Sequence, residues 1–209
     1  FTMKRTCTRF LNLGLVAFAS VLCIPKALAT DVSGTLSSDT TWSASGSPYV
    51  VTGSVLVSEG VKLTVEAGVE VKFSSGTSLQ VFGELVAQGT SSSGIAFTSA
   101  QESKAAGDWG QIMFYDSSVD ASYDGNGDYA SGSILEYCTV EYGGGILLKL
   151  GSPFINQSTI RYHSDSGIRV DTYDYGNSTV RLKITNNTIN NNISKSNGGG
   201  ISLYWYPAN

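Results

Sequence analysis

The sequence predicts an all-β solenoid, in which short strands wind into stacked coils of three strands each. The first observation is a six-residue register: an aliphatic residue, two variable residues, a small polar residue, Thr, and then Val or Ile. This register occurs three times, at residues 135–140, 155–160 and 184–189. After a polar stretch, each copy is followed by a Gly-Ile pair, which begins at Gly145, Gly167 and Gly200. A register that recurs with a second fixed partner is an internal repeat, and repeats of about 20–50 residues are typical of solenoids.

The second observation is that apolar and polar residues alternate from Tyr49 onward, as in Val61, Leu63 and Val65. A period of two predicts half-buried strands of about five residues, separated here by turns that contain Gly. No helical stretch lies between them, so the strands form either an antiparallel sandwich or a coiled parallel solenoid. The solenoid is favoured because the repeated pairs keep one order and no two-residue Asn-Gly or Asp-Gly turn joins adjacent strands.

Cutting the chain at the repeat gives five coils and the beginning of a sixth. First strands are predicted at residues 54–58, 78–82, 110–115, 145–149, 167–171 and 200–204. Second strands are predicted at residues 62–66, 84–87, 133–136, 154–155 and 180–185. Third strands are predicted at residues 69–73, 94–98, 138–141, 158–161 and 187–190. Because side chains alternate along each strand, the aliphatic residues of all coils should form one continuous core.

Residues 1–29 are expected to be a secretory signal peptide. Met3, the apparent start, is preceded by two residues and followed by basic residues, an apolar run at 10–24 and a small-x-small cleavage signal that ends at Ala29. The apolar run is shorter than the ~18 residues that a membrane span requires. We therefore expect cleavage after Ala29 and a secreted or cell-surface protein with no membrane span in the mature chain.

The composition of the remaining 180 residues suits a single acidic domain. Four of the 13 basic residues and none of the 17 acidic residues lie within residues 1–29, which leaves a net charge near −8. That charge argues against nucleic acid or an anionic membrane as a partner. Cys138 is the one cysteine left after cleavage, so an internal disulfide is excluded and stability must come from packing and backbone ladders.

The mature chain divides into two predicted parts. Residues 30–48 are mostly polar and are expected to be an N-terminal cap or a linker, with Trp42 placed to lie across the open end of the core. Residues 49–209 are expected to be the solenoid. Because the chain ends inside a coil, we expect it to be the N-terminal part of a longer protein and to act as a monomer within it.

Three motifs identify the kind of solenoid. They are Ser-Pro-Tyr-Val-Val-Thr-Gly at residues 47–53, Leu-Thr-Val-Glu-Ala-Gly-Val-Glu-Val-Lys-Phe at 63–73 and Gly-Asp-Trp-Gly at 107–110. With them, residues 47–204 resemble the right-handed parallel β-helix repeat proteins of the pectate-lyase-like fold, in the form found in bacterial secreted and cell-surface proteins. The resemblance implies that the small polar residue before Thr sits at an inward corner and stacks on its equivalent in the next coil. Those positions are Cys138, Ser158 and Asn187.

An acidic insertion at residues 116–132 follows the first strand of the third coil. Its oxygen-bearing candidates for a metal are Asp116, Asp120, Asp124, Asn126 and Asp128. The last three have the one-three-five spacing that opens a calcium loop. Tyr129 and Leu135 depart from that pattern at its sixth and twelfth positions. The segment is therefore either an irregular calcium-binding loop or a solvated acidic turn, and the fold itself requires no cofactor.

A second insertion, at residues 172–179, is expected at the same corner two coils later, whereas the coil between has only residues 150–152 there. Two long loops beside a short one would leave a groove. Its candidate ligand-binding residues are Lys149, Asp171, Tyr173, Asp174 and Tyr175. Tyrosine faces stack on sugar rings, and carboxylates bind hydroxyl groups, so the groove predicts a polysaccharide or cell-surface glycan as partner. Simple loop decoration and loop order supported by calcium are the alternatives.

The sequence assigns no catalytic residue. The resemblance implies that a lyase would use a Lys or Arg base, for which Lys149, Arg161 and Arg169 are available, whereas a hydrolase needs paired carboxylates. His163 is the one histidine and is expected to be solvated on a turn. The chain is thus predicted to be a secreted or surface-displayed binding or adhesion scaffold. The alternative is the N-terminal part of a polysaccharide lyase or glycoside hydrolase.

Overall fold

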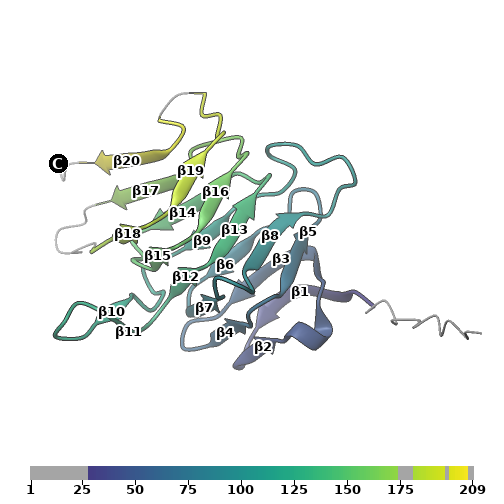
Figure 1. Cartoon of the computed structure of the whole chain (residues 1–209), viewed down its shortest axis with the longest axis horizontal. Helices are drawn as coiled ribbons and strands as arrows, with labels where there is room; N and C mark the ends of the chain where they lie inside the picture. Colours follow the sequence, from purple (N-terminus) through teal and green to yellow (C-terminus); the bar gives the residue numbers. More distant parts are fainter. Residues whose placement is uncertain (1–27, 174–180, 196–197, 207–209) are drawn as a thin grey trace, which may run out of the picture.

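The protein is a right-handed parallel β-helix, as its computed structural model shows for residues 28–173, 181–195 and 198–206 (Figure 1). Short parallel strands from successive coils stack side by side along the molecule. One antiparallel hairpin, β10 (Ser122–Tyr123) with β11 (Tyr129–Ser131), lies beside the stack. Among the described residues, no helix is long and apolar enough to cross a membrane.

The stacked strands form three rows. The first row contains β6 (Leu79–Val81), β9 (Ile112–Phe114), β14 (Ile146–Lys149), β17 (Ile168–Tyr173) and β20 (Ile201–Tyr206). The second row contains β2 (Thr40–Trp42), β4 (Lys62–Val65), β7 (Glu84–Gln88), β12 (Ile134–Glu136), β15 (Phe154–Asn156) and β18 (Lys183–Thr185). The third row contains β5 (Glu70–Phe73), β8 (Ile95–Ser99), β13 (Cys138–Glu141), β16 (Thr159–Arg161) and β19 (Thr188–Asn190).

One long strand, β3 (Tyr49–Val57), joins the first and third rows into a single sheet. Its beginning pairs with β5 of the third row, and its end pairs with β6 of the first row. The strands predicted as first, second and third in each coil lie in the first, second and third rows respectively. The equivalences predicted from the repeat are therefore confirmed for the described strands.

The core is built from columns of apolar side chains that stack from coil to coil. One column runs through five first-row strands, in the register Val57, Val81, Phe114, Leu148 and Val170, and every member is buried. Each fully buried side chain of this size contributes about 1.5–3 kcal/mol relative to an exposed one. The alternation seen in the sequence thus becomes one continuous core.

Residues 30–48 add further strands to the N-terminal end of the stack. Strand β1 (Thr30–Leu36) pairs in parallel with β3 along both halves of that strand, and β2 extends the second row. A short 3-10 helix (Ala44–Gly46) lies between β2 and β3. Trp42 is buried at the end of β2 and stacks on Tyr49, with ring centroids 5.2 Å apart.

The expected inward corner ladder is present between the second and third rows. The Ser158 hydroxyl accepts a hydrogen bond from the Cys138 amide at 3.0 Å, and Oδ1 of Asn187 accepts one from the Ser158 amide at 2.8 Å. The residues just before them, Tyr137, Gln157 and Asn186, all have φ between 49° and 57°. This left-handed turn directs the next side chain inward, where it satisfies a backbone donor of the previous coil.

Candidate functional site

Two of the residues predicted to line a groove, Lys149 and Asp171, line a cavity beside the first row. These two residues are register partners on β14 and β17, and both line a cavity of about 360 Å³. The other lining residues are Tyr115, Asp116 and Leu150. The turn beyond β14 is short, because Leu150 takes a left-handed conformation with φ of 68° and turns the chain directly after the strand. The short turn leaves room for the cavity.

Aromatic rings and charges follow one another along this face, from coil to coil. Tyr115 stacks on Phe82 with centroids 4.0 Å apart, and Nζ of Lys149 lies 5.3 Å from the centre of the Tyr115 ring. Further along, Asp171 is the register partner of Tyr204 on β20. We call the row Phe82, Tyr115, Lys149, Asp171 and Tyr204 the first-row face. Phe82, Tyr115, Lys149 and Asp171 each follow a core residue, namely Val81, Phe114, Leu148 and Val170, so their side chains point away from the core.

Arg169 fixes the orientation of Asp171. Its Nε and Nη2 donate to the two carboxylate oxygens of Asp171 at 2.8 and 3.1 Å, and its guanidinium lies 4.3 Å from the centre of the Tyr204 ring. The hydrogen bond to Asp171 raises the pKa of Arg169 further above its ordinary value. Lys149, by contrast, forms no ion pair with any residue that the structure describes. The cavity therefore offers one cation that is not neutralised by a described neighbour.

Not all of the predicted groove residues can be placed. Tyr173 ends β17, but Asp174 and Tyr175 lie outside the described residues, as does the side chain of Tyr173. The sequence argument missed Tyr115, Phe82 and Tyr204. Phe82 and Tyr115 directly follow the first-row strands β6 and β9, and Tyr204 lies on β20, so their common position shows only when these strands are aligned in register.

The acidic insertion was expected to form one wall of the groove, but most of it lies elsewhere. Its hairpin folds back over the outer face of the second row, where Tyr123 and Tyr129 contact Phe154 with ring centroids 5.7 and 6.0 Å away. This packing buries Ile134, an outward-facing residue of β12. Apolar residues on both the hairpin and the sheet explain the position, because their contact removes them from water.

The five proposed calcium ligands are spread over this insertion. Asp116 lines the first-row cavity, and Oδ1 of Asp120 accepts the Ser152 amide at 2.7 Å. Burial and the charge of Asp116 raise the pKa of Asp120, although its bond to Ser152 opposes the shift. Oδ1 of Asp124 accepts the amides of Asn126 and Asp128, both at 2.9 Å, which closes the hairpin turn.

Calcium binding therefore stays a prediction. Within the described part of the chain, no three Asp, Glu, His or Cys residues form a group that could hold a metal ion. The Asp124–Asp128 segment closes through its own hydrogen bonds, whereas Asp120 binds the Ser152 amide and Asp116 lines the first-row cavity.

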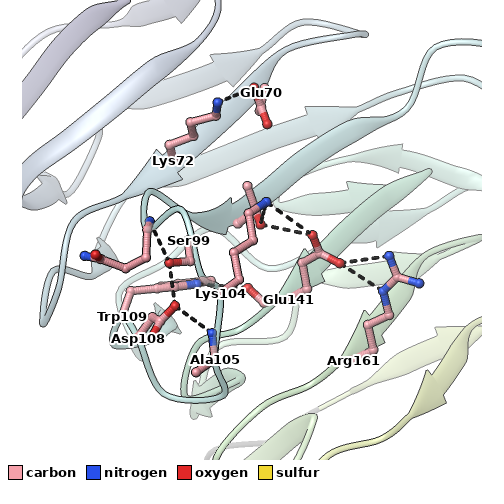
Figure 2. Close-up of polar contacts among 11 residues, drawn as sticks. Glu70, Lys72, Ser99, Lys104, Ala105, Asp108, Trp109, Glu141 and Arg161 are labelled. Carbon is pink, nitrogen blue, oxygen red and sulfur yellow. Dashed lines mark hydrogen bonds and ion pairs between the residues drawn. The ribbon is translucent and has the colours of Figure 1, made fainter.

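A second polar cluster, on the outer face of the third row, is a structural network (Figure 2). Glu141 accepts hydrogen bonds from Nε of Arg161 at 2.9 Å and from the Thr98 hydroxyl at 3.0 Å, and Lys104 lies 4.0 Å from the same carboxylate. Asp108 accepts bonds from the Ser99 hydroxyl at 2.7 Å and the Ala105 amide at 2.8 Å. These contacts hold the loop after β8 against the sheet.

That loop anchors a core residue. Trp109 is buried, stacks on Phe73 with centroids 4.1 Å apart, and donates from Nε1 to the Glu141 carbonyl at 2.9 Å. Gly143 is required opposite it, since a Cβ there would lie 2.8 Å or less from several atoms of the indole ring. The charged groups of this cluster are paired with one another and with the loop, and they fix the loop against the sheet.

The expectation that His163 is solvated was wrong. The side chain is completely buried, and it continues a second ladder at the corner after the third row. Its Nδ1 accepts the Gly143 amide at 3.1 Å, which makes Nε2 the donor to the Val140 carbonyl at 3.0 Å. In the next coil, Asn192 forms the same pair of bonds, to the His163 amide and the Ile160 carbonyl. Burial lowers the pKa of His163 to about 4, so the ring is neutral at physiological pH.

Comparison with known families agrees with this architecture. A family model described as the pectate-lyase like beta helix domain matches residues 34–152, more than half of the chain. Searches of the curated proteins and of the solved structures found no match. The matched region extends from β1 to the short turn beyond β14, and so includes the first-row strands up to Lys149. The chain therefore belongs to the pectate-lyase-like β-helix family.

Proposed function

We propose that this β-helix is a secreted or surface-displayed scaffold that binds glycans through its first-row face. The observation that carries the proposal is the unbroken outward row from Phe82 to Tyr204, with a cavity of about 360 Å³ at its centre. Sugar rings present apolar faces to aromatic side chains, while their hydroxyl and carboxylate groups require polar partners. Tyr115, Lys149 and Asp171 supply both kinds of contact within one cavity.

The spacing of the row suits a chain-like ligand. Neighbouring parallel strands lie about 4.8 Å apart, so side chains from successive coils form a regular ladder along the molecule. An extended polysaccharide lying along the stack would meet Tyr115, then Lys149, then Asp171. The ion pair with Arg169 holds Asp171 in place before any ligand arrives, which reduces the entropic cost of binding.

The test is binding to a glycan array that contains both neutral and uronate-bearing polysaccharides, with and without a calcium chelator. We expect Tyr115→Ala and Lys149→Ala each to weaken binding about tenfold, a loss of roughly 1.4 kcal/mol. Tyr162→Ala is the matched control, because Tyr162 stacks on Tyr142 away from this cavity. Unchanged glycan binding in both cavity variants would show that the first-row face is not the glycan-binding site.

A catalytic function for the same cavity is the second candidate. It is favoured by one observation, that Lys149 lines the cavity together with the carboxylates of Asp116 and Asp171. In a lyase reaction a base removes the proton next to the uronate carboxylate, and the leaving sugar departs to leave a double bond. New ultraviolet absorbance from unsaturated uronate, lost in Lys149→Ala, would support catalysis, whereas binding without any product would support the scaffold.

A further inference from the structure

The outer face of the second row carries another cavity, which the first-row face does not use. It has a volume of about 460 Å³ and lies between the β10–β11 hairpin and the strands β12, β15 and β18. Its floor is made of polar side chains from adjacent coils, and Tyr129 of the hairpin stands beside it. The packing of the hairpin on Phe154 creates this space, so the space depends on the tertiary structure.

The floor is a hydrogen-bonded ladder of four side chains in register on β7, β12, β15 and β18. Its members are Gln88, Glu136, Asn156 and Thr185. Glu136 is central, because its two carboxylate oxygens accept the amides of Gln88 at 2.9 Å and Asn156 at 2.7 Å. The Thr185 hydroxyl then donates to Oδ1 of Asn156 at 2.9 Å. Each bond orients the next group, so the ladder presents amide donors and acceptors in fixed directions.

The aromatic wall is also fixed in place. The Tyr129 hydroxyl donates to the Gly132 carbonyl at 2.6 Å, and its ring stacks on Phe154. Lys183 is held by the hairpin, since its ammonium donates to the Gly127 carbonyl and lies 4.6 Å from the centre of the Tyr123 ring. A rigid ring beside a row of amide, carboxylate and hydroxyl groups is suited to a ligand with apolar faces and many hydroxyls.

The charges around this cavity disfavour an anionic ligand. Glu136 and Asp128 line it, and Lys183, the one lysine among the described residues of its lining, is already engaged by the hairpin. The same negative environment acts on Tyr129, whose pKa is raised to about 12 by burial first and then by Glu84 and Glu136. The first-row cavity differs, because its Lys149 is not paired with a described residue.

We propose that this second-row cavity binds neutral saccharides, whose hydroxyl groups would exchange hydrogen bonds with the Gln88–Thr185 ladder beside Tyr129. The inference is independent of the first-row face, since the two cavities share no lining residue and lie on different rows. The protein would then carry two saccharide sites of different charge preference.

The test uses nuclear magnetic resonance of the full chain with neutral oligosaccharides of xylose, mannose and glucose as probes. We expect at least one of them to shift the side-chain amide signals of Gln88 and Asn156. Gln88→Ala should weaken that binding about tenfold. Gln101→Ala is the matched control, because Gln101 is also exposed and lines neither cavity. Both substitutions remove an exposed side chain, so the fold should be retained.

The outcomes separate the two sites. The proposal is supported if Lys149→Ala leaves the Gln88 and Asn156 shifts unchanged while Gln88→Ala reduces them. It is overturned if no neutral oligosaccharide moves these signals. It is also overturned if Gln88→Ala binds the oligosaccharide as tightly as the original protein does, as judged from the shifts of other residues. It is also overturned if calcium alone moves them to the same extent, because the cavity would then be a cation site. None of these results depends on whether the first-row face binds a glycan.

Discussion

Gly145→Ala is expected to destabilise the β-helix strongly, by on the order of 3 kcal/mol. Gly145 has φ of 93°, a conformation that costs an L-residue with a side chain about 1–2 kcal/mol. A Cβ at this position would also meet the Ser166 carbonyl oxygen of the next coil. That oxygen belongs to the backbone, and the adjoining Gly167 carbonyl accepts the Ile146 amide at 2.9 Å, so the neighbouring coil cannot move away without loss of pairing. Overpacking of this kind adds about 1–3 kcal/mol.

Gly200→Ala is the control for this prediction, because Gly200 occupies the equivalent position in the third Gly-Ile pair. Apart from its chain neighbours, no atom of the described residues lies within 4 Å of the place where its Cβ would be, and its φ is outside the left-handed region. Urea unfolding followed by circular dichroism should show a clear loss for Gly145→Ala and little change for Gly200→Ala. Equal losses of stability would mean that glycine is required at every Gly-Ile pair, whether or not a Cβ there would contact the next coil.

Acid is expected to destabilise the protein through His163 in a defined pH window. The pKa of His163 is lowered by burial from 6.5 to about 4. Below pH 6.5 the unfolded chain therefore binds a proton at this residue while the folded chain does not. The stability contributed by the neutral ring is complete above pH 6.5 and is lost as the pH falls to about 4, by on the order of 3 kcal/mol. Below pH 4 both states are protonated and the residue adds no further dependence.

Substituting His163 separates its contribution to the pH dependence of stability from the contributions of the carboxylates. Asn192 makes the same two hydrogen bonds in the next coil, so His163→Asn should keep the ladder and fold at neutral pH. The free energy of unfolding should then fall less between pH 7 and pH 4.5 in His163→Asn than in the original protein. His163→Leu should be the least stable variant at pH 7, because it leaves the Gly143 amide and Val140 carbonyl without partners. Parallel pH profiles for the original protein and His163→Asn would contradict the assignment.

Much of the fold could be predicted from the sequence because its signals are local and repeated. The alternation around Leu63 and Val65 places both in the core, where both are buried. The recurring small residue before Thr predicts the corner ladder of Cys138, Ser158 and Asn187. Such patterns predict the structure well because every coil has the same backbone geometry and packs its side chains in the same way.

The candidate sites were predictable only in part. Lys149 and Asp171 were expected to share a groove between two long insertions, and they do line one cavity, although the acidic insertion packs on Phe154 of the second row. Tyr115 was missed because its contact with Lys149 links two coils, and neither sequence segment by itself contains a pattern that predicts the contact. His163 was misread for a similar reason. A histidine after a turn looks solvated until the Gly143 amide and Val140 carbonyl of the preceding coil are placed around it.

The sequence by itself determined where the strands of the repeated coils lie, which of them are equivalent and which of their side chains fill the core. Those properties follow from a period of two and from a repeated turn. The tertiary structure decided where the acidic insertion lies, and so created the second-row cavity beside Tyr129. A loop of this length can fold in many directions, and contact with Phe154 on another coil selects one of them. That contact joins residues with no fixed sequence spacing, which is why no periodicity in the chain could reveal it.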